Sequence, residues 1–179
     1  MTFEKNLDPE RALARLTKGG RIMAVEDRLS LRRVVDDVRG YLSGERVDFD
    51  YQLDLRDVTE FNRGVLELAR TIPYGTLKSY KWVAETIGSP RATRPVGQAL
   101  AHNPLPVVVP CHRVVNSDGS LGGYSGGGPD MKRRLIGIEA GQMGFPLGES
   151  EGEVRRRVRF LLETDAPPIE SDDEVDAAP

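Results

Sequence analysis

Cysteine is almost absent from this sequence, which has a single one, Cys111, among 179 residues. One cysteine cannot form an intramolecular disulfide, and it cannot build a cysteine-rich zinc site. We therefore expect a protein of a reducing compartment whose stability comes from a packed core.

Long apolar runs are also missing. No uninterrupted apolar stretch approaches the roughly 20 residues that span a bilayer, and the opening residues, MTFEKNLDPER, lack the apolar centre of a secretory signal. We expect a cytoplasmic protein with no membrane partner. The length allows one domain, or two small domains in contact.

The charge is unevenly distributed along the chain. The formal net charge is −3, but residues 163–179 hold seven acids and no base, so the rest carries a net charge of +4. Residues 63–139 alone carry 10 bases and 5 acids. A segment of this sign attracts phosphate backbones, although a solvated basic face has the same composition.

A helix and then a strand are predicted near the start of the chain. Apolar residues at 31, 34, 35, 38, 41 and 42 have helical spacing, with Ser30 as the N-cap. Residues 47–55 alternate apolar and polar side chains, which predicts a half-buried strand. With a further helix over residues 8–18 and a strand over 21–24, the first ~55 residues resemble a small α/β unit.

A capping-box spacing at Asp57 and Glu60 predicts the start of another helix, which ends at the turn of residues 73–75. Its predicted apolar face consists of Phe61, Val65, Leu68 and Ile72. Two short helices follow, one over residues 78–87 and one from near Pro95, where proline favours an extended N-cap at Arg94.

These two short helices carry bases at Lys78, Lys81, Arg91 and Arg94. Two helices around a glycine-containing turn are typical of a DNA-binding helix-turn-helix. An ordinary packed helical hairpin has the same spacing, so the residues alone leave both interpretations open.

Cys111 lies where a predicted strand, residues 107–109, ends at Pro110. A lone cysteine is usually a small buried apolar side chain, but His112 and Arg113 follow it directly, and positive neighbours favour the reactive thiolate. Successive side chains of an extended segment point to opposite faces. We therefore expect His112 to reach the sulfur only through a bend or a bridging water, with a third group orienting the imidazole.

A glycine-rich loop, residues 122–128, precedes a helix predicted over residues 131–139. The loop lacks the pattern of a phosphate-binding loop, which argues against nucleotide binding. It is either a flexible surface loop or a place where backbone N–H groups near Ser125 approach a flat base. Beyond it, residues 154–162 predict a basic amphipathic helix, and residues 163–179 predict a disordered acidic tail.

Several short motifs occur together in a recognisable order. They are IPYG at 72–75, SY at 79–80, RPVG at 94–97, NP at 103–104, VPCHRV at 109–114, GYSG at 123–126 and Glu139. Over residues 55–141 the chain resembles the O6-alkylguanine-DNA alkyltransferases, the methylated-DNA-protein-cysteine methyltransferases.

The resemblance implies an α/β (α+β) fold. A small N-terminal α/β domain, ribonuclease-H-like, would span residues 1–56. A mostly helical alkyltransferase and DNA-binding domain would span residues 57–141, with a helix-turn-helix and a short strand leading to the cysteine. Residues 142–162 would form an extension with a helix, and residues 163–179 the disordered tail.

The resemblance also implies a function. Such a protein flips O6-alkylguanine out of duplex DNA from the minor groove and transfers the alkyl group irreversibly to a cysteine, once per molecule. O6-methylguanine is the expected substrate, with O4-methylthymine as a further one. Double-stranded DNA is the expected partner of a monomer, with no cofactor and no metal.

The resemblance carries roles onto particular residues. The catalytic set would be Cys111 as nucleophile, His112 as base through a water, Glu139 orienting the imidazole, Tyr80 protonating the guanine, and Asn103 bracing the cysteine turn. DNA contact and base flipping would involve Arg94 as the residue filling the vacated stack, with Arg91, Arg113 and Tyr80. The substrate pocket would be lined by Val114, Tyr124, Ser125, Gly126 and Pro106.

Three other functions remain open. A non-catalytic lesion-binding protein of the same fold is one, although Cys111 argues against it. A transcriptional regulator would need a second DNA-binding domain, and a cysteine hydrolase would need an oxyanion hole that nothing in the sequence specifies. The acidic tail is expected either to solubilise the protein or to weaken nonspecific DNA binding by competing with phosphate.

Overall fold

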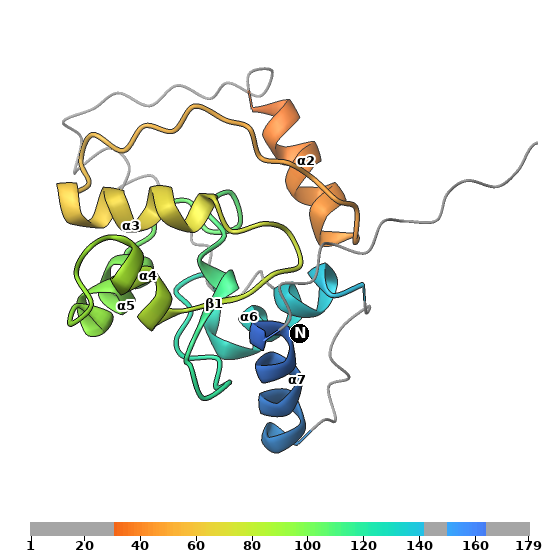
Figure 1. The fold of residues 1–179 in the computed structure, drawn as a ribbon. Helices are drawn as coiled ribbons and strands as arrows, with labels where there is room; N and C mark the ends of the chain where they lie inside the picture. Colours follow the sequence, from red (N-terminus) through yellow and green to blue (C-terminus); the bar gives the residue numbers. More distant parts are fainter. Residues whose placement is uncertain (1–30, 142–149, 164–179) are drawn as a thin grey trace, which may run out of the picture. The chain divides into compact units, whose positions relative to one another are not determined.

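The computed structural model describes residues 31–141 and 150–163 (Figure 1). The chain divides into two units, Met1–Arg39 and Gly40–Pro179, and the domain boundaries expected from the sequence stay a prediction. The helix expected over residues 8–18, the strand over 21–24, the cap at Ser30 and the tail from residue 164 lie outside the described residues.

The described residues combine helices with one short parallel sheet, which confirms the mixed fold class. The helices are α2 (Arg32–Leu42), α3 (Glu60–Arg70), α4 (Tyr80–Thr86), α5 (Thr93–Ala101), α6 (Gly128–Glu139) and α7 (Glu151–Glu163). Strands β1 (Lys78–Ser79) and β2 (Val114–Val115) pair in parallel, with Lys78 opposite Val114. A single 3-10 turn, η2 (Cys111–Arg113), leads into β2.

Helix α3 begins and packs differently from the prediction. Its N-cap is Thr59 rather than Asp57, because the Thr59 hydroxyl accepts a hydrogen bond from the Asn62 N–H at 3.4 Å. Phe61, predicted on the apolar face, is 38% exposed. The buried side chains are Val65, Leu66, Ala69 and, past the helix end, Ile72. The buried face is therefore rotated from the predicted one.

Residues 47–55 keep the predicted alternation but do not form the predicted strand. Their odd-numbered side chains are buried or half-buried and their even-numbered ones are exposed. Within residues 31–141 and 150–163 no segment pairs with them, and short local bonds such as Tyr51 N–H to Phe49 O at 3.0 Å take the place of a ladder. A strand needs a neighbouring backbone as well as a period of two, so the prediction of a strand is wrong here.

Helices α4 and α5 form the predicted pair of short helices (Figure 1). The Ser79 hydroxyl caps α4 by accepting from the Trp82 N–H at 3.0 Å, and Gly88 follows the helix with φ +73°. Arg94 lies inside α5, so the prediction that it is an extended N-cap is wrong. Pro95 fits the first turn because N–H groups there have no intrahelical partner.

The chain turns before the cysteine instead of running as a strand. Residues 107–108 form a turn between Pro106 and Val109, which make an isolated bridge. Val107 has φ +77°, a left-handed conformation that is rare for a β-branched residue. The predicted strand leading to Cys111 is therefore wrong, and the strand that exists, β2, follows the cysteine.

Two apolar clusters hold these elements in place. The larger one joins α3, α4 and α5 to the cysteine turn and includes Val65, Val83, Val96 and Cys111. The smaller one packs α6 and α7 against β2 through Leu77, Val115, Ile136, Val154 and Val158. Helices α6 and α7 confirm the two predicted C-terminal helices, although each begins three residues earlier than predicted. None of the described helices is long and apolar enough to cross a membrane.

Candidate active site

Cys111 is buried and its sulfur accepts a hydrogen bond. The Asn103 amide Nδ2 lies 3.1 Å from Sγ and also donates to Val109 O at 2.9 Å, while its Oδ1 accepts from the Leu105 N–H. Asn103 therefore ties the sulfur to the turn that precedes it. Burial raises the pKa of the Cys111 thiol, and the Asn103 bond and the positive charge of Lys132 oppose that shift. The thiol consequently needs a base at neutral pH.

His112 is fully buried and supplies a neutral imidazole. Burial lowers its pKa, and the bond to Glu139 acts in the opposite direction. Its Nε2 lies 2.9 Å from Glu139 Oε1, whereas its Nδ1 has no hydrogen-bond partner within the described part of the chain. Because a carboxylate only accepts, the proton belongs on Nε2 and leaves Nδ1 as the basic nitrogen.

Glu139 ends α6 and faces several donors at once. Arg113 Nε and Nη2 each lie 2.9 Å from a carboxylate oxygen, the Gly75 N–H donates at 3.1 Å, and the Tyr41 hydroxyl donates at 2.5 Å. Burial opposes ionisation, but the hydrogen bonds from His112 and Arg113, together with the charge of Arg113, outweigh it and lower the pKa of Glu139 to about 2. The group is a carboxylate at every working pH.

Arg113 lies in the interior and not on a DNA-facing surface. Besides its contacts with Glu139, its Nη1 donates to Ile72 O at 2.6 Å, and its guanidinium lies over the Tyr74 ring. The contacts with Ile72 and Tyr74 fix the guanidinium, and the guanidinium in turn holds the Glu139 carboxylate in place. The DNA contact expected at Arg113 therefore has no geometric support.

Tyr80 stands at the start of α4 beside a buried lysine. Burial raises the pKa of its hydroxyl to about 12, so it keeps its proton. Lys132 is 0% exposed and its ammonium donates to Val114 O at 2.6 Å, to Leu121 O at 2.5 Å and to the Tyr80 oxygen at 3.3 Å. Burial lowers the pKa of Lys132 to about 8, which leaves it charged at pH 7.

The residues predicted to line the substrate pocket differ in their burial and in their contacts. Val114 is fully buried and its carbonyl already accepts from Lys132. The Tyr124 ring meets the His112 ring edge-on with centroids 6.4 Å apart, and a Cβ at Gly126 would lie 2.8 Å from the Tyr124 ring. Ser125 is exposed, and Pro106 is half-buried on the cysteine turn. The loop therefore requires glycine at position 126 while Tyr124 folds over it.

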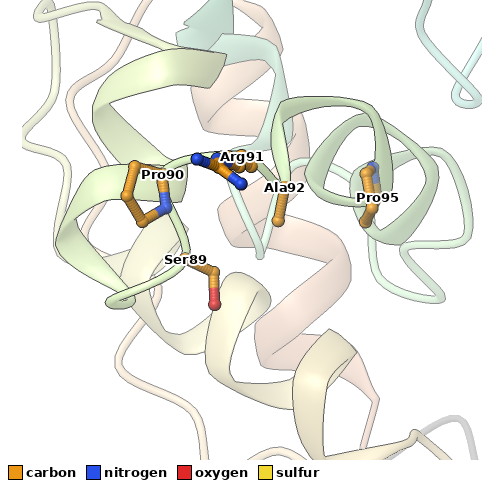
Figure 2. A pocket seen from close by; sticks show the side chains of 5 residues that line it. All are labelled: Ser89, Pro90, Arg91, Ala92 and Pro95. Carbon is orange, nitrogen blue, oxygen red and sulfur yellow. The ribbon is translucent and has the colours of Figure 1, made fainter.

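Arg91 and Arg94 are exposed on the α4–α5 hairpin. Figure 2 shows an open hollow along this hairpin, lined by Ser89, Pro90, Arg91, Ala92 and Pro95. The thiol is thus buried, whereas the two arginines of the hairpin are exposed to solvent.

Sequence reasoning missed two members of the centre. Tyr41 belongs to a helical apolar pattern, so nothing marked its hydroxyl as functional. Lys132 begins a run of three bases in α6, which is usually a solvated face. The sequence did contain one indication that α6 is buried on one side, namely the adjacent apolar residues Leu135 and Ile136.

Comparison with known proteins agrees with this arrangement. The family model described as 6-O-methylguanine DNA methyltransferase, DNA binding domain, matches residues 60–141. A methylated-DNA-protein-cysteine methyltransferase of Mycolicibacterium paratuberculosis is 50% identical over 105 residues, 59% of this chain and 62% of that protein. One of Methanosarcina barkeri is 39% identical over 115 residues, 64% of this chain and 72% of that protein.

A solved structure agrees in fold as well. The crystal structure of Mycobacterium tuberculosis OGT in complex with DNA superposes with a TM-score of 0.59 at 44% identity, covering 63% of this chain and 68% of that one. The chain thus spans about three-fifths of the length of the first of these relatives, and more than two thirds of the second. By this similarity the chain belongs to the methylated-DNA-protein-cysteine methyltransferase family.

Proposed function

We propose that this protein repairs duplex DNA by transferring the alkyl group of O6-alkylguanine to Cys111. One observation carries the proposal: a buried thiol is followed directly by a neutral imidazole whose Nε2 bonds a carboxylate and whose Nδ1 has no partner among residues 31–141 and 150–163. This is the arrangement of an activated nucleophile with its base and the group that orients the base.

The reaction is a single displacement. Cys111 Sγ attacks the alkyl carbon, so that an S–C bond forms as the C–O6 bond of the guanine breaks. The thiol proton passes through a water to His112 Nδ1, and the Tyr80 hydroxyl gives its proton to the departing guanine, which leaves neutral. Glu139 stabilises the imidazolium that forms, as a buried carboxylate does for a general base.

The state of Tyr80 supports its assignment as the acid. Its raised pKa keeps the hydroxyl protonated, and the Lys132 ammonium donates to its oxygen, which leaves the O–H free to donate. A positive charge beside the phenol also stabilises the negative charge that develops when the proton leaves.

The protein turns over once. The product is a thioether, which has no leaving group that water displaces readily at neutral pH. O6-methylguanine is the primary substrate, and O4-methylthymine offers the same alkyl carbon on an exocyclic oxygen. The chemistry uses only side chains of this chain, and we propose that it runs in a cytoplasmic monomer.

Double-stranded DNA is the proposed partner, approached from the minor groove. The exposed hairpin of α4 and α5 carries Arg91 for phosphate contact and Arg94 for the stack that the flipped base vacates. The relative from Mycobacterium tuberculosis was solved in complex with DNA, which supports DNA as the partner.

The test is the mass of the intact protein after incubation with a duplex that carries one O6-methylguanine. The expected result is a stoichiometric gain of one methyl group in the wild type and none in Cys111→Ser. Tight, lesion-selective binding without a mass change would refute the transfer and identify a non-catalytic lesion-binding protein.

A further inference from the structure

The hydroxyl of Tyr41 joins the His112–Glu139 pair from outside the region that the family model matches. Tyr41 lies in the last turn of α2 and is 0% exposed, whereas the match begins at residue 60. Its oxygen lies 2.5 Å from Glu139 Oε1 and 3.0 Å from His112 Nε2. The three polar atoms form a closed triangle.

The chemistry of the three groups fixes the direction of each bond. Glu139 is a carboxylate and only accepts, so the Tyr41 O–H donates to Oε1. The Tyr41 oxygen then faces His112 Nε2 with its lone pairs, and Nε2 keeps a proton that both oxygens accept. This arrangement leaves Nδ1 without a proton.

The phenol is held in place and stays protonated. Its ring packs edge-on against Phe49 and Tyr74, with centroids 5.6 and 6.2 Å away. Burial and then the negative charge of Glu139 raise the pKa of the Tyr41 hydroxyl, so it donates throughout the working range of pH.

We propose that Tyr41 is a positioning residue for base catalysis at Cys111. By bonding both Glu139 and His112, its hydroxyl holds the imidazole in the one tautomer and orientation in which Nδ1 accepts the thiol proton. Tyr41 acts through His112 and touches neither DNA nor the alkyl group. The inference concerns the same site as the proposed function and rests on it.

The surrounding charges stay the same when only this hydroxyl is removed. The titratable and charged groups that face Tyr41 and His112 are Glu139, Arg113, Tyr74, Lys132, Cys111 and the Tyr124 ring. Tyr41→Phe keeps the ring, its packing and all of these groups. A change in the pH dependence of thiol reactivity therefore reports on the hydroxyl.

Tyr74→Phe is the matched control. It also removes one phenol oxygen from the same cluster of packed aromatic rings. That oxygen lies 3.4 Å from Ile138 O and bonds neither His112 nor Glu139. The probe is iodoacetamide, which alkylates thiols faster than amines, and Cys111 is the only thiol of the chain; the slower alkylation of other groups is measured in Cys111→Ser and subtracted. The sulfur displaces iodide, its proton goes to the base, and intact mass follows the rate.

At about pH 7 we expect Tyr41→Phe to react roughly tenfold more slowly than the wild type, because the loss of one hydrogen bond to a charged group changes an equilibrium by about tenfold. The deficit should shrink toward about pH 10, where hydroxide ionises the thiol without the imidazole. Tyr74→Phe should follow the wild type at each pH. Rates are compared well below the melting temperature of each variant.

Equal rates at pH 7, a deficit that does not change with pH, or the same deficit in Tyr74→Phe would each overturn the inference. Iodoacetamide needs no DNA, so failure here is separable from failure of the repair reaction. A wild type that is methylated by the lesion duplex but shows no Tyr41 effect refutes the inference alone. A pH-dependent Tyr41 effect in a protein that is not methylated refutes the repair function alone.

Discussion

Replacing Glu139 by glutamine tests how far one carboxylate stabilises the fold. The side chain keeps its shape but loses its charge, and Arg113 loses its buried counter-ion. Removing one partner of a buried ion pair costs about 3–5 kcal/mol. The lowered pKa gives a second figure, because its fall from 4.5 to about 2 corresponds to roughly 3–4 kcal/mol at about 1.4 kcal/mol per unit. The two figures agree.

The sign of the pH dependence follows from the direction of that shift. An acid whose pKa is lower in the folded state contributes stability above its unfolded pKa of 4.5, and this stability is lost as the pH falls toward about 2. Glutamine does not titrate. We therefore expect the free energy of unfolding of the wild type to exceed that of Glu139→Gln by about 3 kcal/mol at pH 7, and by roughly half of that or less at about pH 3.

The assay is urea unfolding of both proteins from pH 7 down to pH 3, followed by tryptophan fluorescence at the single Trp82. A difference below about 1 kcal/mol at pH 7, or one that stays constant as the pH falls, would show that Glu139 is not the stabilising carboxylate described here.

Three further variants test other parts of the site. Val107→Gly should be more stable than Val108→Gly by roughly 1–2 kcal/mol in urea unfolding, because only Val107 has a positive φ; equal losses would contradict this. Lys132→Met should slow the reaction of Cys111 with iodoacetamide at pH 7, because the Lys132 charge lowers the thiol pKa and its loss raises that pKa; an unchanged rate would count against that role. Gly122→Ala should lower the melting temperature by an amount equivalent to about 1 kcal/mol, as its φ is +70°.

The candidate site was predictable from the sequence where the chemistry lies in consecutive residues. The motif around Cys111 and His112 marks the thiol and its base, and Glu139 ends α6 as it ends the helix predicted over residues 131–139, although α6 begins three residues earlier. The need for a third group to orient His112 was also predictable, because an imidazole beside a thiol rarely acts alone.

The two strand predictions that were wrong, over residues 47–55 and 107–109, share one physical cause: a local sequence pattern does not specify which backbone segment lies beside it. The alternation of residues 47–55 fixed which side chains are buried, but a strand also needs a second backbone. Likewise, valines at 107–109 favour a strand by propensity, yet the packed cysteine turn holds Val107 at φ +77°.

The sequence by itself determined the family motifs, the helices and the order of the catalytic residues along the chain, since these depend on spacing between near neighbours. Only the tertiary structure decided that Tyr41 and Glu139, 98 positions apart, are hydrogen-bonded, and that Lys132 is buried. Burial and long-range hydrogen bonds set the ionisation of each group, and neither is encoded in any short stretch of sequence.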